Sequence, residues 1–450
     1  MQVKTSGALA GVRVIDSTTM VAMPTTANIM ADMGAEVIKV ESHTIFRTES
    51  DRLIYAEGDP GTEPWNRDGS FNTLQHGKLG ATFNFKTEEG IEGFKELVRI
   101  SDVMIENNRA GTMDRLGLGY EDLKKIKPDL IYVSNTGFGH TGPWKRYAGI
   151  GRMFELTCGV SQFTGYLDEG PRRVGKAFFD LHVGWAGVFA ILAALHYRQQ
   201  TGKGQWLDFS MYQVGVSTVG DAILDFVANG RNGEVLGNRH ATFAPQGVYP
   251  CLGNDQWIGI SIEDNEQWDR FKGFMGNPDW AQDSRFNLPS GRMDGHDEID
   301  TFLSDWTRGQ DAFQLEESLQ AAGIPAAAVK NSRQVLTDPH LDERGFFEHV
   351  KHPEDSGLGE RVYTGRPWKM SGTPAYIRRP APRLGEDNDY VFQDLLGRTS
   401  DDMKELERVN AIGKDPIDPP VFKPLTYDKQ LEDGTLAAVD AEYRKVLRIE

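Results

Sequence analysis

The feature that most constrains the fold is an alternation of short apolar runs with amphipathic stretches over the first third of the chain. The apolar runs have the length of buried strands, and they are residues 12–15, 37–40, 103–105 and 130–133. The amphipathic stretches between them have helical spacing, and they are residues 25–33, 87–101 and 120–126. Strands that alternate with helices predict an α/β fold with a doubly wound, mostly parallel sheet. Ligands of such sheets bind at the carboxyl ends of the strands.

The pattern changes after a long helical stretch that follows Asp180. Residues 240–262 read as strand, turn and strand, and helical segments near residues 268, 297–306 and 313–322 complete a smaller α+β unit. We therefore predict three parts. Residues 1–237 form a large α/β domain with a linker helix, and residues 238–330 form a small α+β domain. Residues 331–450 form a third part with a C-terminal tail, and the chain is irregular from residue 324 except for a helix near 401–409.

The charge of the chain limits its partners. Lys and Arg number 49 and Asp and Glu number 66, so the formal net charge is -17. A surface this acidic repels nucleic acid and anionic membranes, and we expect neither as a partner. An anionic ligand would need locally placed cations or helix N-termini.

Cysteine content and apolar segments bear on the compartment. The two cysteines, Cys158 and Cys251, form no metal-binding pattern, so we expect a reducing compartment, no metal and no disulfide framework. The first residues lack the apolar region of a signal peptide. The longest apolar run, residues 183–195, is too short to span a bilayer. We therefore expect a cytoplasmic protein.

One glycine motif resembles a dinucleotide-binding fingerprint. Residues 137–142 read GFGHTG and follow a predicted strand. The fingerprint requires a helix to open at once, so that its N-terminus faces the pyrophosphate. Gly149 and Gly151 argue against a helix there. A tight glycine turn at the end of a strand is the better interpretation, which disfavours an NAD-dependent oxidoreductase.

Several collinear blocks resemble the class III CoA-transferases, the family of formyl-CoA transferase and carnitine CoA-transferase. The blocks cover about residues 8–410, and together they are far more specific than any one alone. They are LAGVRVID at 9–16, MGAEVIKVE at 33–41, DVMIEN at 102–107 with Arg109 and Gly111, GFGHTGP at 137–143, Asp180 with AAL at 193–195 and Arg198, TGKGQ at 201–205, GIP at 323–325, DPH at 338–340 and GTP at 372–374.

The resemblance implies a fold and an activity. Members have a large Rossmann-like domain built from both chain ends, a smaller inserted domain, and two chains threaded through each other as interlocked rings. The resemblance therefore implies that residues 1–237 are the first part of the large Rossmann-like domain, residues 238–330 the inserted domain, and residues 331–450 a linker and the return to the large domain. We therefore expect an interlocked homodimer, with a heterodimer with a paralogue as the alternative. The implied activity is transfer of coenzyme A from an acyl-CoA donor to a carboxylic acid. CoA is then a co-substrate, and no tightly bound cofactor is expected.

Asp180 aligns with the catalytic aspartate of the family. It directly precedes a long apolar helical stretch, so we expect it to be an N-cap, where backbone N–H groups and the helix dipole favour the carboxylate. An ionised carboxylate at a cleft is the nucleophile that attack on a thioester requires. The resemblance implies an aspartyl anhydride followed by an aspartyl-CoA thioester. The alternative is that Asp180 only caps the helix.

CoA also needs cations or amides for its phosphates. The resemblance assigns Lys78 and Arg115 to positions that contact CoA, and Arg109 lies in the loop after a strand end. Each is otherwise an ordinary surface cation. Gly137 and Gly139 allow close backbone approach near the thioester, or are plain turn glycines. His140 and His182 are interpreted as structural, because carboxylate exchange needs no general base.

Departures from the family bear on the acceptor. Val21 stands where formyl-CoA transferase has a glutamine, and Lys78-Leu79 replaces a common Lys-Arg pair. A glycine-rich lid is not evident in residues 237–262. These departures argue against oxalate and favour a larger or less polar acid, either a substituted dicarboxylic acid or an aromatic acid.

The rival within this fold is an α-methylacyl-CoA racemase. Racemisation needs two bases on opposite faces of the α-carbon. The racemases carry a histidine after the glycine block, where this chain has residues 148–151, AGIG, with Ile150 in place of that base. Transfer is therefore favoured over racemisation.

Overall fold

The computed structural model describes residues 6–45, 54–167, 169–175, 177–419 and 426–449. It divides into two compact units. The sheet unit contains Met1–Cys158, Gly175–Gly220 and Pro339–Glu450, and the insert unit contains Gly159–Val174 and Asp221–Asp338. The range 238–330 predicted as a small domain falls within the insert unit. Residues 159–174 also belong to the insert unit, and no local sequence pattern predicts this.

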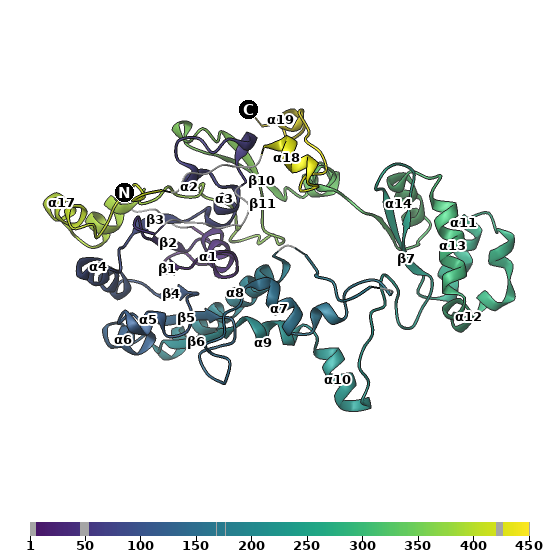
Figure 1. The fold of residues 1–450 in the computed structure, drawn as a ribbon, viewed down its shortest axis with the longest axis horizontal. Coiled ribbons are helices and arrows are strands. Elements are labelled where there is room, and N and C mark those ends of the chain that lie inside the picture. The colour runs from purple at the N-terminus through teal and green to yellow at the C-terminus, as the bar shows by residue number, and fades with distance from the viewer. Residues whose placement is uncertain (1–5, 46–53, 168, 176, 420–425, 450) are drawn as a thin grey trace. The chain divides into compact units, whose positions relative to one another are not determined.

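A six-stranded sheet forms the core of the sheet unit, and all its strand pairs are parallel. Its strand order is β3-β2-β1-β4-β5-β6, which Figure 1 labels in sequence. This is the Rossmann order, with a topological switch point between β1 and β4. The strands are β1 (Arg13–Ser17), β2 (Glu36–Glu41), β3 (Leu79–Thr82), β4 (Val103–Glu106), β5 (Ile131–Thr136) and β6 (Gln205–Ser210).

Helices cover both faces of this sheet. On one face, alternate strand residues such as Ile15 and Met104 share a core with Phe94 of α4 and Leu123 of α6. On the other face, α1 packs along α8. Burial on both faces explains why β1, β2, β4 and β5 contain continuous apolar runs. The helices are α1 (Ala22–Asp32), α4 (Glu88–Arg99), α5 (Thr112–Arg115), α6 (Tyr120–Ile126), α7 (Gly151–Thr157), α8 (Phe178–Thr201) and α9 (Met211–Ser217), with α2 (Pro64–Arg67) and α3 (Gly69–Gln75) between β2 and β3.

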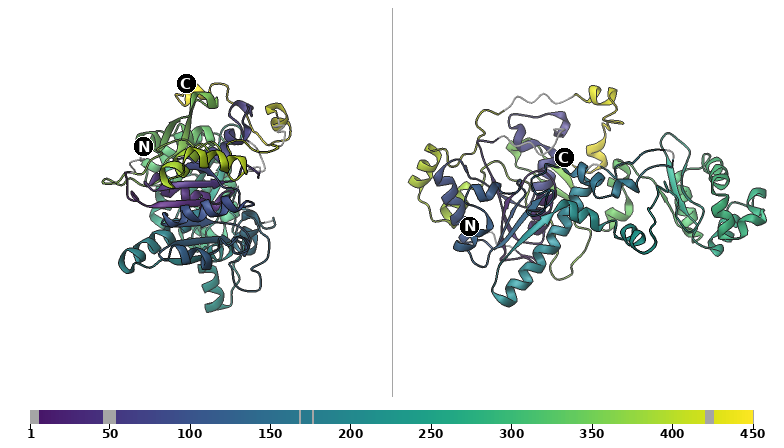
Figure 2. Two further views of the ribbon diagram at one scale, coloured as in Figure 1. Left: turned by 90° about the vertical axis from the view of Figure 1, so that its left-hand side faces the viewer. Right: turned by 60° about the horizontal axis from the view of Figure 1, so that its bottom comes forward.

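The C-terminal part of the chain returns to the sheet unit and covers the edge strand β3. A π-helix at Tyr390–Leu395 and α17 (Ser400–Arg408) add Phe392 and Met403 to the core of the first face. The carboxylate of Asp387 accepts a hydrogen bond from the Gly80 amide at 2.7 Å, so a buried amide of the edge strand is satisfied. Figure 2 shows this yellow-green segment beside the purple strands.

The segment expected to be irregular contains a hairpin. Strands β10 (Phe347–Lys351) and β11 (Glu360–Thr364) pair in antiparallel register, and α15 (Ser332–Leu336) and α16 (Pro339–Glu343) precede them. The expectation was wrong because FEHVK and ERVYT mix charged and apolar residues without an uninterrupted run. Short helices α18 (Tyr427–Glu432) and α19 (Tyr443–Val446) follow later; of the predicted tail, residues 420–425 and 450 lie outside the described ranges.

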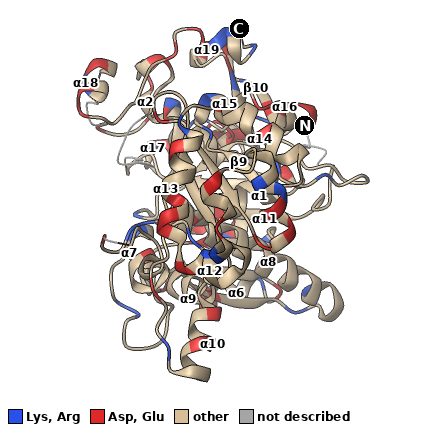
Figure 3. Ribbon diagram, turned by 90° about the vertical axis from the view of Figure 1, so that its right-hand side faces the viewer, with Lys and Arg blue, Asp and Glu red and all other residues tan. Residues whose placement is uncertain are grey.

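The insert unit is an α+β layer with its own core. The antiparallel strands β7 (Gln246–Pro250), β8 (Trp257–Ser261) and β9 (Ala326–Ala328) form its sheet. Trp268, Phe271 and Leu303 are fully buried in its core. Acidic residues occur on several of its helices, including α10, α11 and α13, as Figure 3 shows. The helices are α10 (Gly220–Asn229), whose first residue belongs to the sheet unit, α11 (Asn265–Phe274), α12 (Pro289–Asp294), α13 (His296–Thr307) and α14 (Ala312–Ala321).

Helix α8 is longer than its sequence pattern implied. The apolar residues 183–195 lie within α8, a helix of 24 residues. The expectation that this segment is too short to span a bilayer was therefore wrong. By length and composition alone α8 could cross a membrane, with a hydropathy of 1.8 over its most apolar window. A core helix of a globular domain meets the same test, and one side of α8 packs along α1.

Candidate active site

The carboxyl edge of the sheet is organised around the switch point between β1 and β4. The side-chain amide of Asn107, after β4, accepts a hydrogen bond from the Thr19 amide at 2.9 Å and donates one to the Thr19 carbonyl at 2.7 Å. These two bonds join the loops that diverge at the switch point. Residues 18–21, between β1 and α1, are named here the β1–α1 loop.

Asp180 is the third residue of α8, and not its N-cap. The N-cap position is held by Ala177, with a φ of 78° and no side-chain hydrogen bond. The predicted cap was placed three residues too late, because the helix begins at Phe178, before the apolar run becomes continuous. Asp180 still lies in the first turn, where unsatisfied N–H groups and the helix dipole favour a negative charge.

The face of α8 that carries Asp180 packs on the start of α1. One and two turns further along α8, Gly184 and Gly187 stand on the same face. A Cβ added at Gly184 would lie 2.7 Å from the Ala22 carbonyl oxygen, and the Gly184 carbonyl accepts a hydrogen bond from Thr26 at 2.8 Å. Asp180 therefore stands one turn before the point where α8 meets the first residue of α1, at the level of the β1–α1 loop.

Helix α7 lies against the carboxylate of Asp180. A Cβ added at Gly151 would lie 2.1 Å from Oδ2 of Asp180, so only glycine fits at this position. Glu155 follows Gly151 by one turn, on the same face of α7, and is 1% exposed. The aspartate is thus enclosed by a glycine and a second carboxylate.

This environment raises the pKa of Asp180 to about 6, first through burial and then through the negative charge of Glu155. The expectation that the surroundings favour the ionised form was wrong in sign, because burial outweighs the first-turn hydrogen bond. At pH 7 about nine-tenths of such a carboxyl is still ionised. A carboxylate with a raised pKa is a stronger nucleophile than an ordinary one.

The glycines of the GFGHTG motif form a turn at the end of β5. The ring of Phe154 occupies the space that a Cβ at Gly137 would need. Gly139 has a φ of 85°, and its amide donates to Thr136 Oγ1 at 2.8 Å. No helix opens after the motif until Gly151, so the geometry of a dinucleotide fingerprint is missing in this described stretch.

The predicted CoA cations fall into two groups. Lys78 is fully buried, and its ammonium donates to Asp16, Gln75 and the Pro24 carbonyl. Its protons are engaged inside the protein, so this geometry does not favour a direct phosphate contact. Arg109 and Arg115 are exposed on the loop and short helix that follow the switch point.

The two histidines lie at different places. Nδ1 of His140 is 3.1 Å from Oδ1 of Asp208, whose carboxylate also accepts from the His140 amide. His182 is exposed on α8. Among the described residues, no group of three or more His, Cys, Asp or Glu side chains is arranged to hold a metal ion.

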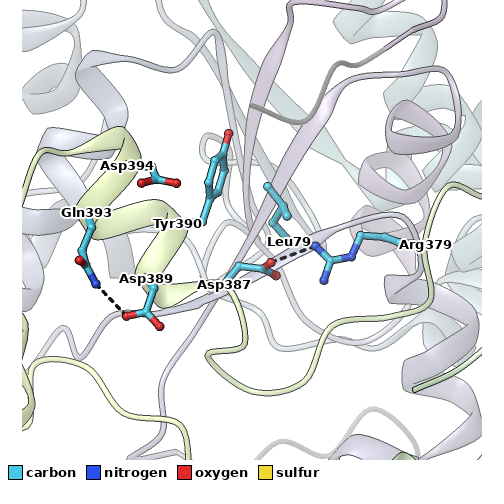
Figure 4. Close-up of a pocket in the computed structure, with 7 residues that line it drawn as sticks. All are labelled: Leu79, Arg379, Asp387, Asp389, Tyr390, Gln393 and Asp394. Carbon is cyan, nitrogen blue, oxygen red and sulfur yellow. Dashed lines mark hydrogen bonds and ion pairs between the residues drawn. The ribbon is translucent and has the colours of Figure 1, made fainter. Parts of the chain in front are cut away.

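A separate pocket of about 360 Å³ lies at the amino end of β3, away from the carboxyl edge (Figure 4). It is lined by Asp387, Asp389 and Asp394, and its arginine, Arg379, is paired with Asp387 at 3.0 Å. Three carboxylates around one engaged cation repel phosphates. This pocket does not suit CoA.

Sequence reasoning missed Glu155 and Gly151 as neighbours of Asp180, and Asn107 as the bridge across the switch point. Asn107 lies within a family block, which was a usable signal. Glu155 carried none, because its proximity to Asp180 depends on how α7 packs against α8.

Comparisons with known proteins agree with this geometry. The model of CoA-transferase family III matches residues 9–388. The succinyl-CoA–D-citramalate CoA-transferase of Chloroflexus aurantiacus is 32% identical over 410 residues, which cover 90% of this chain and 98% of that protein. The acetyl-CoA:oxalate CoA-transferase of Acetobacter aceti is 32% identical over 400 residues, covering 85% and 94%. The crystal structure of a CAIB/BAIF family protein from Brucella suis has a TM-score of 0.77 at 30% identity, covering 87% of this chain and all of that one.

The fold and these relatives define an enzyme that transfers coenzyme A. The chain belongs to CoA-transferase family III.

Proposed function

We propose that this enzyme moves CoA from an acyl-CoA donor to a dicarboxylic acid, with Asp180 as the nucleophile. The observation that carries the proposal is the setting of Asp180, a half-buried carboxylate in the first turn of α8 whose pKa is raised to about 6. Such a group is mostly ionised at neutral pH yet reactive toward a thioester carbonyl.

In the proposed sequence, a carboxylate oxygen of Asp180 attacks the thioester carbonyl carbon and the C–S bond breaks. The CoA thiolate leaves with the bonding electrons, and an aspartyl anhydride forms. The thiolate then attacks the Asp180 carbonyl carbon, which releases the first acid and leaves an aspartyl-CoA thioester. The acceptor carboxylate repeats these two steps in reverse, so no net proton transfer is needed.

The acceptor is proposed from chemistry that the relatives share. Citramalate is a substituted succinate, and oxalate is also a dicarboxylic acid; both occur in the names of relatives. Val21, at the entry to α1, replaces the glutamine of formyl-CoA transferase and presents an apolar side chain. We therefore keep a substituted dicarboxylic acid as the acceptor, with oxalate disfavoured and an aromatic acid as the alternative.

For the phosphates of CoA we propose Arg109 and Arg115. Both are exposed at the switch point, where Rossmann-like sheets bind ligands, in a chain of otherwise negative net charge. Gly137 and Gly139 are proposed to keep the turn after β5 narrow beside Phe154.

The assembly is proposed to be an interlocked homodimer. Within α8, Phe178 and Phe189 are exposed, and α10 contains no buried residue although Leu224 and Val227 are large and apolar. Apolar helix surfaces of this kind are covered in an obligate oligomer. The buried free cysteines Cys158 and Cys251 are consistent with the proposed cytoplasmic location. Light scattering should give the mass of two identical chains; a monomer, or a second polypeptide after purification, would contradict the homodimer.

The test of the function is covalent labelling. The enzyme is incubated with succinyl-CoA and other acyl-CoAs, reduced with borohydride, and digested for mass spectrometry. The Asp180 peptide should carry the modification. Asp180→Asn should lose it together with at least about 1,000-fold in transfer rate.

Asp221→Asn, the same change in the first turn of α10, is the matched control and should keep both properties. Full transfer activity in Asp180→Asn would refute the covalent mechanism. Exchange of the α-proton with solvent, without transfer, would favour the racemase, although Ile150 stands exposed where that enzyme needs a base.

A further inference from the structure

Three charged side chains are buried together beneath the β1–α1 loop. Asp16 on β1, Lys39 on β2 and Lys78, just before β3, are at most 1% exposed, and Asp16 and Lys39 are paired in the sheet register. We name them the charged triad. Buried charges cost desolvation energy that a well-packed apolar group does not, so their presence calls for a reason other than stability.

Each member of the triad holds the main chain that leads into α1. Asp16 Oδ1 accepts hydrogen bonds from the Thr18 amide, at 3.1 Å, and from the Thr18 hydroxyl. The ammonium of Lys39 donates to the Thr18 carbonyl. Lys78 Nζ donates to Asp16 Oδ2 at 2.7 Å and to the Pro24 carbonyl, in the first turn of α1, at 3.0 Å. Thr18 is thus fixed at its amide, carbonyl and hydroxyl.

The loop is held from its other side as well, in an unfavourable conformation. Asn107 makes its two hydrogen bonds to Thr19. The next residue, Met20, has a φ of 67°, which non-glycine residues adopt only where their surroundings impose it. Bonds to Thr18 and Thr19 therefore determine where the peptide groups of Met20 and Val21 lie.

This loop stands at the level of the proposed nucleophile. Gly184 of α8 contacts Ala22, the residue after the loop, and Asp180 precedes Gly184 by one turn on the same face. The triad also carries a formal charge of +1, from two ammonium groups and one carboxylate. That positive charge lies under the edge of the sheet at which the proposed reaction takes place. The reacting groups there, carboxylates and a thiolate, are negatively charged and are stabilised by it.

We propose that the charged triad positions the β1–α1 loop for CoA transfer, with Lys39 and Lys78 as positioning residues that act through Thr18 and Pro24 instead of touching CoA. The inference rests on the proposed function, since it concerns the geometry around Asp180. It gives Lys78 a role different from the phosphate contact that its position in the family predicts.

The test compares Thr18→Val with Thr18→Ser. Valine keeps the branched shape and removes the hydroxyl bonded to Asp16, whereas serine keeps the hydroxyl. Thr18→Val should lower kcat about 10- to 100-fold with the KM for acyl-CoA within about threefold, and Thr18→Ser should recover most of kcat. Lys39→Met, which leaves the Asp16–Lys78 pair intact, should resemble Thr18→Val.

The matched control is Thr307→Val in the insert unit. Thr307 is also fully buried, and its hydroxyl donates to the Pro250 carbonyl at 2.8 Å, so this variant loses a comparable bond in the other unit. Its kcat should stay at the wild-type value. Circular dichroism tests whether each variant is folded. If Lys39→Met does not fold, the comparison of Thr18→Val with Thr18→Ser tests the positioning role.

Labelling of the Asp180 peptide separates the two proposals. If wild type neither transfers CoA nor becomes labelled, the proposed function fails. If wild type does both while folded Thr18→Val keeps full kcat, the positioning role is refuted and the function stands. A rise in KM alone, with kcat unchanged, would also refute it, because that is the signature of a direct CoA contact.

Discussion

Asp16 and Asp180 are two carboxylates of the sheet unit whose surroundings move their pKa values in opposite directions. Burial opposes ionisation of Asp16, but the charges of Lys78 and Lys39 and the hydrogen bonds from Lys78 and Thr18 prevail, so its pKa is lowered. Burial also acts on Asp180, but its charged neighbour is Glu155, and its pKa is raised to about 6. Burial acts in the same direction on both carboxyl groups, so the opposite signs of their pKa shifts come from the charges and hydrogen bonds of their neighbours.

The largest loss of stability is expected when Asp16 loses the ammonium group of Lys78. Lys78→Met leaves Asp16 buried with only Lys39 nearby, and we expect the free energy of unfolding to fall by about 3–5 kcal/mol. The double variant Asp16→Asn/Lys78→Met should recover part of that loss, because no bare charge remains. Urea denaturation at pH 7 measures both.

The exposed pair of Lys404 and Asp401 on α17 provides the control for this prediction. Lys404→Met should change the free energy of unfolding by less than about 1 kcal/mol, since exposed ion pairs contribute little. Equal losses in the two lysine variants would show that the burial of Lys78 has no special consequence.

Crowding the reactive carboxylate should affect activity more than stability. In Gly151→Ala the new methyl group would meet Oδ2 of Asp180, so the carboxylate must turn away, and we expect kcat to fall about 10- to 100-fold. Gly273→Ala, where an added Cβ meets open space, is the control and should keep the wild-type kcat. Wild-type kcat in folded Gly151→Ala would contradict the position described for Asp180.

The raised pKa of Asp180 has a cost in stability with a defined pH window. The unfolded chain ionises this group near 3.8 and the folded chain near 6, so the penalty is absent below pH 3.8 and complete above pH 6. Asp180→Asn should therefore raise the free energy of unfolding at pH 7.5 by about 1–3 kcal/mol, and by much less at pH 4.5.

Asp16 has the opposite dependence on pH. Because its pKa is lowered in the folded protein, its ionised carboxylate stabilises the fold fully above pH 3.8. This contribution is lost as the pH falls from 3.8 through the lowered pKa. Urea denaturation curves at the two pH values test the Asp180 prediction. A gain in Asp180→Asn that is the same at pH 4.5 and 7.5 would show that ionisation of Asp180 is not its cause.

The smallest effect is expected at Glu155. Glu155→Gln removes the like charge near Asp180, so the acid limb of the kcat profile should move to lower pH by less than about one unit. Glu92→Gln, on the exposed side of α4, should leave the profile in place. A shift to higher pH would mean that Glu155 does not raise the pKa of Asp180.

Local patterns predicted much of the sheet unit. The runs at 37–40 and 103–105 lie within β2 and β4, and the predicted helix 120–126 coincides with α6. Strand β3 was missed because LGAT has too few apolar residues to form a run, and β6 because one side of its alternating pattern is exposed. Helix α1 begins three residues before the predicted start, since Pro24 is tolerated in a first turn.

The parallel α/β class could be predicted from strands that are apolar on both faces. The collinear family blocks identified Asp180 as the candidate nucleophile. Two features could be seen only in the folded structure. Lys78 binds Asp16 instead of facing solvent, and Glu155 and Gly151 lie next to Asp180. The reason is physical: hydrophobic periodicity reports which face of an element is buried, whereas the pairings of Asp16 with Lys78, Thr19 with Asn107 and Gly151 with Asp180 join elements far apart in the chain.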